Sequence, residues 1–264
     1  MRKLAIVLLL ATAAFAQAPK ATPSTPPDPN AQKARKLLQQ GIQALGGQAW
    51  LNAKDMEQEG RSYGYQHGSP SGMGVQFWRF WKYPDKDRIE LTKQRDVVYI
   101  YNGDKGYEIT FKGTAAMDPV DLKNYIRRRE HSLETVLRAW LPDPKTALFY
   151  DGPAMAQQKY TDKVTLLNAN NDSVTLYLDR DTHLPVKTEF EWRAPDRLKD
   201  VENEIFDNWR LEQGVMTPHS TMRMHNGAIT NQRFITSVKY NQGFPDKMFQ
   251  ATVNFTPNRP DHPE

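Results

Sequence analysis

The short turns between the predicted strands restrict the possible folds of this chain more than any other feature of its sequence. From Asp55 onward, apolar and polar residues alternate with the period of two that is typical of β-strands. Asn226-Gly227 joins two such segments, and this dipeptide is the strongest two-residue hairpin signal. Strands joined by so short a turn pair antiparallel, because a parallel pair needs a long crossover. The sequence therefore predicts an antiparallel sheet.

About ten strands are predicted, and a sheet of this size curls or closes rather than staying flat. Two helical segments accompany them, at residues 31–45 and 118–141, and the run Arg127-Arg128-Arg129 divides the second into two short helices. Two helices are too few to cover both faces of a sheet. We therefore predict a mainly β (α+β) fold: a strongly curved antiparallel sheet forming a half-open β-barrel, with helices on its concave side as a plug or lid. The predicted strands are residues 75–83, 88–93, 97–101, 107–111, 164–168, 173–178, 185–193, 201–211, 215–224 and 229–240.

The N-terminus predicts export. Two basic residues precede an apolar stretch from Leu4 to Leu10, and Ala14-Phe15-Ala16 supplies a small-x-small cleavage pattern. We expect a cleavable signal peptide at residues 1–16, a Pro/Ala/Thr-rich tether at 17–30, one domain at 31–250 and an irregular tail at 251–264. The predicted location is periplasmic or secreted.

Charge and cysteine content exclude several classes of protein. Without the two basic residues of the signal peptide, 33 basic residues stand against 31 acidic ones, which argues against nucleic acid as the main partner. The chain has no cysteine, which excludes a lipidated cysteine, disulfides and thiol catalysis.

The sequence contains no catalytic, cofactor or metal motif that we can identify. There is no G-x-S-x-G, P-loop, G-x-G-x-x-G or H-E-x-x-H pattern. His219 and His225 lie six residues apart on a predicted strand, which separates them by about 20 Å at ~3.3 Å per residue. We therefore predict no metal site and no cofactor.

Aromatic residues on both faces of one strand leave two interpretations open. In residues 75–83, Phe77 and Trp81 point to one side and Trp78 and Phe80 to the other. These residues are suited to packing between helices and sheet, with a neighbouring loop or the tether shielding the outer set. They are equally suited to a cavity that accepts an acyl chain.

The order of these features resembles the LolA/LolB-like superfamily of periplasmic lipoprotein carriers and lipoprotein-sorting proteins. The resemblance covers residues 31–249 and rests on three loose motifs: A-L-G-G at residues 44–47, D-R-D-T-H-L-P at 179–185, and V-K-Y-N-Q-G-F-P-D-K-M-F at 238–249. It implies a curved sheet around helices, with an apolar cavity for lipid or acyl chains, and no catalysis. Head-group candidates are Arg127, Arg128 and Arg129; cavity candidates are Phe77, Trp81, Tyr99, Ile109, Leu133, Leu137, Trp140, Leu176, Phe190 and Trp192.

Three hypotheses follow. The favoured one is a non-enzymatic exported protein that binds lipid or lipoprotein acyl chains, with outer-membrane lipoprotein sorting as a candidate role. The second is an exported hydrolase using a pair of strand carboxylates, Glu189 with Glu191 or Glu202 with Glu204, which would lie about 6.5–7 Å apart. Mixed charges around Glu189 and Glu191 are also typical of a solvated strand face. The third is an envelope-complex subunit that docks on an inner-membrane transporter or an outer-membrane receptor.

Overall fold

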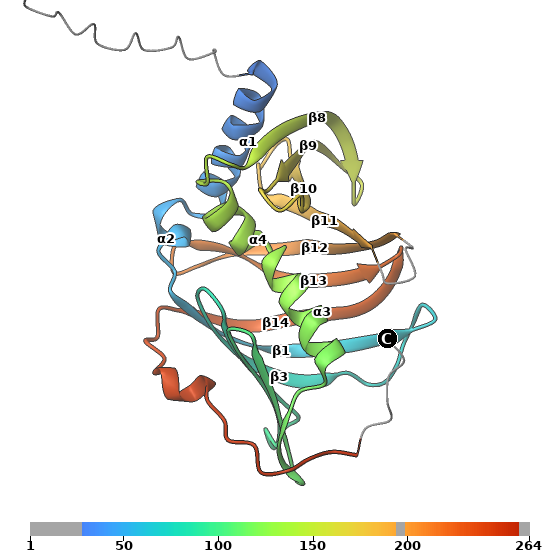
Figure 1. The fold of residues 1–264 in the computed structure, drawn as a ribbon. Helices are drawn as coiled ribbons and strands as arrows, with labels where there is room; N and C mark the ends of the chain where they lie inside the picture. The colour runs from blue at the N-terminus through green and yellow to red at the C-terminus, as the bar shows by residue number, and fades with distance from the viewer. Residues whose placement is uncertain (1–27, 194–198, 259–264) are drawn as a thin grey trace, which may run out of the picture.

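The computed structural model describes residues 28–193 and 199–258 (Figure 1). The predicted signal peptide and residues 17–27 of the predicted tether lie outside these ranges, as do residues 259–264 of the predicted tail. Residues 194–198 connect two strands and are likewise outside them.

The first helix begins two residues earlier than predicted. Asp28 caps it by accepting a hydrogen bond from the backbone N–H of Asn30, and Pro29 occupies its first turn, where a missing N–H is tolerated. Gly46 ends it with φ of 120°. Residues 118–141 form more than one helical segment, as predicted, but the break falls at His131-Ser132 rather than at the arginine run, which forms the last turn of the first segment. The helices are α1 (Pro29–Leu45), α2 (Gln48–Leu51), α3 (Pro119–Glu130), α4 (Leu133–Thr135), the π-helical turn η1 (Val136–Trp140) and the 3₁₀ turn η2 (Asp246–Phe249).

All described strands form one antiparallel sheet of 14 strands. Its order is β7-β6-β5-β4-β3-β1-β14-β13-β12-β11-β10-β9-β8, and β2 pairs with β1 outside this path. The strands are β1 (Asp55–Gln66), β2 (Ser69–Pro70), β3 (Val75–Lys82), β4 (Lys86–Leu91), β5 (Val97–Asn102), β6 (Lys105–Thr110), β7 (Gly113–Ala116), β8 (Ala147–Ala156), β9 (Lys159–Leu167), β10 (Ser173–Asp179), β11 (Pro185–Arg193), β12 (Lys199–Glu212), β13 (Val215–His225) and β14 (Ala228–Tyr240).

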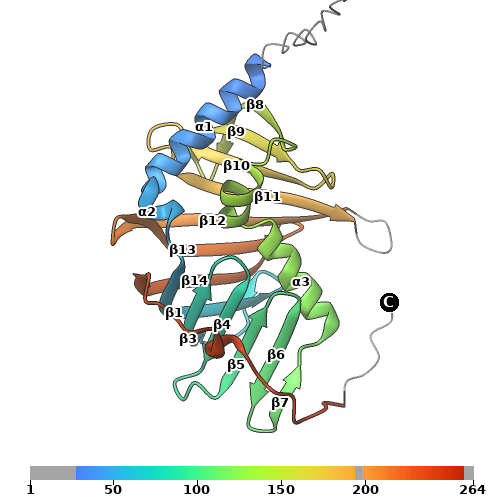
Figure 2. The same cartoon turned by 60° about the vertical axis from the view of Figure 1, so that its left-hand side comes forward.

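The predicted half-open barrel is confirmed, but the estimate of ten strands was wrong. The sheet curves without closing, and its helices cross the concave side (Figures 1 and 2). Shifts of register, such as the one at Glu59/Gly60 between β1 and β14, increase the local twist of the sheet. At Gly60 a Cβ atom would lie 2.2 Å from the carbonyl oxygen of Phe234, so this bulge requires glycine.

The main hydrophobic core lies between the concave face and the helices. Helix α1 contributes Ala34, Leu38, Ile42 and Leu45, all buried at helical spacing. Leu133, Val136 and Leu137 of α4 and η1 join the same cluster. Helix α3 differs from these elements because it has no buried residue, although it crosses the same face of the sheet (Figure 1).

A second cluster covers part of the convex face. Trp78 and Phe80 of β3 pack there with Val98, Ile100 and the fully buried Phe249. The alternation predicted for residues 75–83 is therefore confirmed, since Phe77 and Trp81 belong to the main core instead. The element that shields the outer aromatics is the segment after β14.

Asp246 anchors this segment to β3 and β4. Its carboxylate accepts hydrogen bonds from Lys82 Nζ at 2.6 Å and from Lys86 Nζ at 2.8 Å. These bonds lower the pKa of Asp246 from 3.8 to about 2. A depressed carboxyl pKa stabilises the folded state fully above the unfolded value and loses that contribution as the pH falls. The contribution of Asp246 should therefore be lost between pH 3.8 and about 2.

An NMR titration of the folded protein should give the Asp246 carboxyl a midpoint near 2. The double variant Lys82→Met/Lys86→Met should return the midpoint to near 3.8, since both donors are removed. A midpoint near 3.8 in the unmodified protein would contradict the bridging arrangement.

Asparagine side chains from outside the sheet hydrogen-bond to the backbone of its two edge strands, β8 and β7. On β8, the amide of Asn30 donates to the carbonyl of Tyr150 at 2.9 Å and accepts from its N–H at 2.7 Å. On β7, Asn254 Oδ1 accepts from the N–H of Thr114 at 2.7 Å, and the N–H groups of Asn254 and Phe255 donate to the carbonyl of Thr114.

Candidate functional site

A cavity of about 140 Å³ lies between the concave face of the sheet and the helices α3 and α4. A cavity needs ~10–15 Å³ of such volume to hold one water molecule, so this cavity has room for about ten water molecules. Strands β1, β3 and β11–β14 supply most of its lining. One part, which we call the apolar end, is lined by Leu45, Trp50, Met56, Trp81, Trp209 and Met216.

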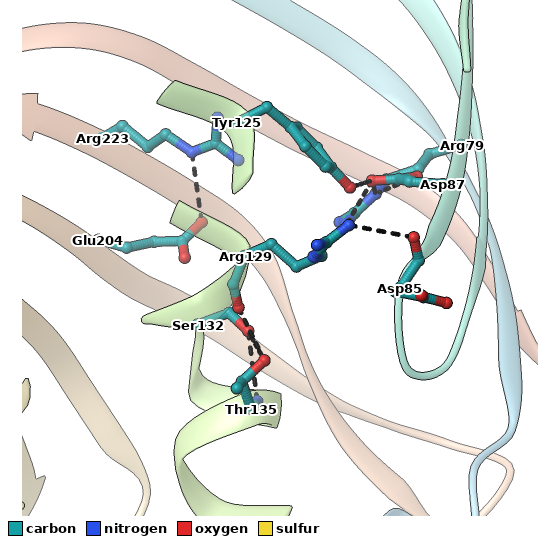
Figure 3. Close-up of polar contacts among 9 residues, drawn as sticks. All are labelled: Arg79, Asp85, Asp87, Tyr125, Arg129, Ser132, Thr135, Glu204 and Arg223. Atoms are coloured by element: carbon teal, nitrogen blue, oxygen red, sulfur yellow. Dashed lines mark hydrogen bonds and ion pairs between the residues drawn. The ribbon is translucent and has the colours of Figure 1, made fainter. Parts of the chain in front are cut away.

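The other part, which we call the arginine end, is lined by charged side chains from α3 and four strands. Cross-strand register brings two of its arginines together: Thr221 lies opposite Arg233, so Arg223, two residues from Thr221, is a diagonal neighbour of Arg233 on the same face. Part of this region is drawn in Figure 3. The arginine end consists of Arg79, Arg128, Arg129, Arg223, Arg233, Glu202 and Glu204.

Arg79 is tightly paired. Its Nε lies 3.0 Å from both carboxylate oxygens of Asp87, which is buried, and the Tyr125 hydroxyl donates to the same carboxylate at 2.9 Å (Figure 3). Burial alone would lower the pKa of Arg79, but Asp87 raises it above its ordinary value. Burial and Asp87 both raise the pKa of Tyr125. Arg79 therefore keeps its charge, and the contacts among Arg79, Asp87 and Tyr125 tie α3 to β3 and β4.

Arg129 anchors the end of α3 to two turns of the sheet. Its guanidinium donates to the carbonyls of Asp85, at 3.2 Å, and Gly103, at 2.7 Å. One turn earlier in the helix, Tyr125 stacks on Tyr101 of β5 with ring centroids 3.4 Å apart. Helix α3 is thus held over the cavity by polar and ring-stacking contacts.

Of the remaining three arginines, two are loosely paired and one has no ion-pair partner among the described residues. Arg223 Nε lies 3.7 Å from Glu204, and Arg128 lies 4.0 Å from Glu202. Arg233 has no hydrogen bond or ion pair with the described residues, and its guanidinium carbon lies 5.4 Å from the centroid of the Phe77 ring. Burial, then Arg223 and Arg79, lower the pKa of Arg233 to about 9. Burial and Arg223 also lower the pKa of Arg128. These guanidinium groups repel one another.

Three of the predicted cavity residues line the cavity: Trp81, Leu133 and Phe190. The others nearby belong to the surrounding core, either buried in it or packed against it. They are Phe77, Leu137, Trp140, Leu176 and Trp192.

Two predicted cavity residues lie elsewhere. Ile109 packs against the convex-face cluster, on the other side of the sheet from the cavity. Tyr99 contacts Glu108 on the neighbouring strand, and burial together with Glu108 raises its pKa. Neither residue is part of the cavity lining.

The predicted head-group residues separate in the same way. Arg128 and Arg129 line the cavity. Arg127 instead lies over the Trp192 ring, with its guanidinium carbon 3.4 Å from the ring centroid. Among the residues that the structure describes, no lysine lines the cavity.

Sequence reasoning missed Arg79, Arg223 and Arg233. One signal was available: Arg79 lies between Phe77 and Trp81 on the predicted inward face of a strand. A charged residue that shares a face with buried aromatics calls for a partner or a polar cavity. Arg223 and Arg233 carry no comparable local signal, because their proximity depends on strand register.

The two carboxylate pairs lie on opposite faces of the sheet. Glu189 pairs with Lys187 at 2.8 Å and Glu191 with Lys199 at 2.6 Å. Because side chains alternate along a strand, Glu189 and Glu191 lie on the face of the sheet opposite to that of Phe190, as solvated strand residues do. Glu202 and Glu204 line the cavity, each beside an arginine.

Within the described ranges, no three or more acidic, histidine or cysteine side chains are grouped so that they could hold a metal ion. Among the helices of the same residues, none has the length and apolarity needed to cross a membrane.

Comparison with known proteins identifies the fold. No family model and no curated protein matches the sequence. Solved structures do match. A DUF1329 family protein from Desulfovibrio piger is 10% identical, with 84% of this chain and 97% of that one covered and a TM-score of 0.58. A protein from Vibrio parahaemolyticus, described as an outer membrane lipoprotein-sorting protein domain, is also 10% identical; the match covers 83% of this chain and 97% of that one, with a TM-score of 0.53. A LolA superfamily protein from Nitrosomonas europaea is 12% identical; the match covers 83% of this chain and 97% of that one, with a TM-score of 0.51.

Proposed function

We propose that this chain, which has the fold of LolA-superfamily proteins, is an exported, non-enzymatic protein that binds lipid or lipoprotein acyl chains in its cavity. The observation that carries the proposal is the apolar end, where tryptophan, leucine and methionine side chains surround open space. Apolar pockets of this kind favour apolar ligands. The signal-peptide pattern at residues 1–16 supports export.

The attachment of α3 supports access to this cavity. The helix has no fully buried residue, and its contacts to the sheet include the Tyr125–Asp87 bond, the Arg129–carbonyl bonds, the Arg128–Glu202 ion pair and ring contacts. An element with few buried apolar contacts opens at a lower free energy than the core does. Helix α3 is therefore the element whose displacement would admit an acyl chain.

The charges around Glu202 and Glu204 favour binding over hydrolysis. An inverting glycosidase needs one carboxyl group that carries a proton and one that does not. Arg128 lies beside Glu202 and Arg223 beside Glu204, so the two carboxylates have similar surroundings rather than the contrasting ones that an acid–base pair uses.

The test is lipid binding with and without a charge in the apolar end. Mass spectrometry of organic extracts should reveal lipid bound to the purified protein, and a fluorescent fatty-acid probe should bind to the delipidated protein. Met216→Lys should weaken probe binding at least tenfold, about 1.4 kcal/mol, because it places an ammonium group among apolar side chains.

Met155→Lys is the matched control, since Met155 is exposed on β8 and lies outside the cavity. It should leave probe binding unchanged, and the melting temperatures of both variants would show that they fold. Absence of bound lipid together with absence of probe binding would overturn the proposal.

A further inference from the structure

We propose that Arg128, Arg223 and Arg233 form a binding site for a phosphoryl group at the arginine end of the cavity. This inference rests on the proposed function and deepens it: the ligand would be an amphiphile with its apolar chain in the apolar end and an anionic phosphoryl head group among these arginines.

The three side chains converge from different elements. Arg223 and Arg233 are diagonal neighbours on the concave face of β13 and β14, and Arg128 reaches the same cavity from α3 on the opposite side. A group between them would meet guanidinium donors from the sheet and from the helix. Closure of α3 over the ligand would complete the site.

Their hydrogen-bonding capacity is largely unused within the described residues. Arg233 donates to none of them, and the Nε of Arg128 is buried without a partner. The nearest carboxylates lie at 3.7 Å from Arg223 and 4.0 Å from Arg128, both beyond the 2.7–2.9 Å of a charge-assisted hydrogen bond. By contrast, Arg79 and Arg129 are engaged by Asp87 and by backbone carbonyls.

The balance of charge also favours an anion. The five arginines of the cavity exceed the four nearby carboxylates, Asp87, Glu134, Glu202 and Glu204, by one. An unpaired interior guanidinium is costly, and mutual repulsion adds to the cost. A phosphoryl group would offset both effects, because its oxygens match the planar fork of donors that each arginine presents.

The test compares three soluble probes by calorimetry: dihexanoyl phosphatidic acid, the uncharged dihexanoylglycerol, and inorganic phosphate. The phosphorylated amphiphile should bind at least tenfold more tightly than the uncharged one. Arg233→Met should weaken its binding at least tenfold without weakening that of dihexanoylglycerol. The control is Arg61→Met, on β1, whose exposed side chain lies on the opposite face of the sheet; it should change neither affinity.

Stability of the ligand-free protein separates a binding role from a structural one. If Arg233 awaits an anion, Arg233→Met should raise the melting temperature by about 2–4 °C, because an unpartnered charge is removed. A lower melting temperature would assign Arg233 a structural role and overturn the inference.

The outcomes also separate the two proposals. Equal binding of both amphiphiles, unaffected by Arg233→Met, would overturn the phosphoryl site and leave the proposed lipid binding intact. Binding of inorganic phosphate without either amphiphile would support the anion site with free phosphate as its ligand and overturn lipid binding. Binding of no probe would overturn the phosphoryl site, and the proposed lipid binding would also be overturned if the purified protein held no lipid and did not bind the fatty-acid probe.

Discussion

Replacing Asp87 with Asn is expected to lower the free energy of unfolding by about 3 kcal/mol. Asp87 is 1% exposed and is the only carboxylate hydrogen-bonded to Arg79 in the described part of the chain. Without its charge, Arg79 would remain in the interior beside other arginines. Tyr125 would also lose its charged acceptor, which would weaken the attachment of α3. Urea denaturation followed by tryptophan fluorescence measures this change.

Asp85→Asn is the matched control on the same hairpin. Asp85 accepts from Arg129 through its backbone carbonyl rather than its carboxylate, so the substitution should change stability by less than about 0.5 kcal/mol. The double variant Asp87→Leu/Arg79→Met should recover much of the loss, because it removes both charges together. A loss of less than ~1 kcal/mol in Asp87→Asn would contradict the importance of this pair.

Replacing Phe249 with Ala should lower the free energy of unfolding by about 3–5 kcal/mol, the usual cost of emptying the site of a buried aromatic ring. Phe249 is 0% exposed and packs with Trp78, Phe80, Val98 and Ile100 on the convex face. Phe111, which is 92% exposed, provides the control: Phe111→Ala should cost less than about 0.5 kcal/mol. Equal effects of the two substitutions would mean that the segment after β14 is not an integral part of the domain.

Much of the sheet was predictable because local turn chemistry and alternation agree with it. Asn226 and Gly227 both adopt positive φ, at 49° and 80°, as the hairpin turn predicted there requires. Strand β8 was missed for the opposite reason. Gly152 and Pro153 interrupt its pattern, and the structure accommodates them at a register shift on an edge strand, where a missing N–H is tolerated.

The cavity was harder to predict because it depends on which strands become neighbours. Leu176 has the pattern of an inward-facing residue, but the surrounding core fills the space around it. Ile109 alternates correctly yet packs on the other side of the sheet, since the C-terminal segment covers that face. Arg223 and Arg233 meet only through the register of β13 and β14, and an isolated strand with such residues is indistinguishable from one with a solvated face.

The two asparagines at the sheet edges bear on how this molecule behaves at high concentration. An open sheet ends in unpaired N–H and C=O groups, which are templates for the strands of another copy. Here the backbone N–H and C=O of Tyr150 on β8 are already bonded to Asn30. Those of Thr114 on β7 are bonded to Asn254 and its neighbour Phe255. The two side chains come from opposite ends of the described chain. Removing either terminal segment would therefore expose unpaired backbone groups on an edge strand, and we expect a shortened form of this domain to self-associate.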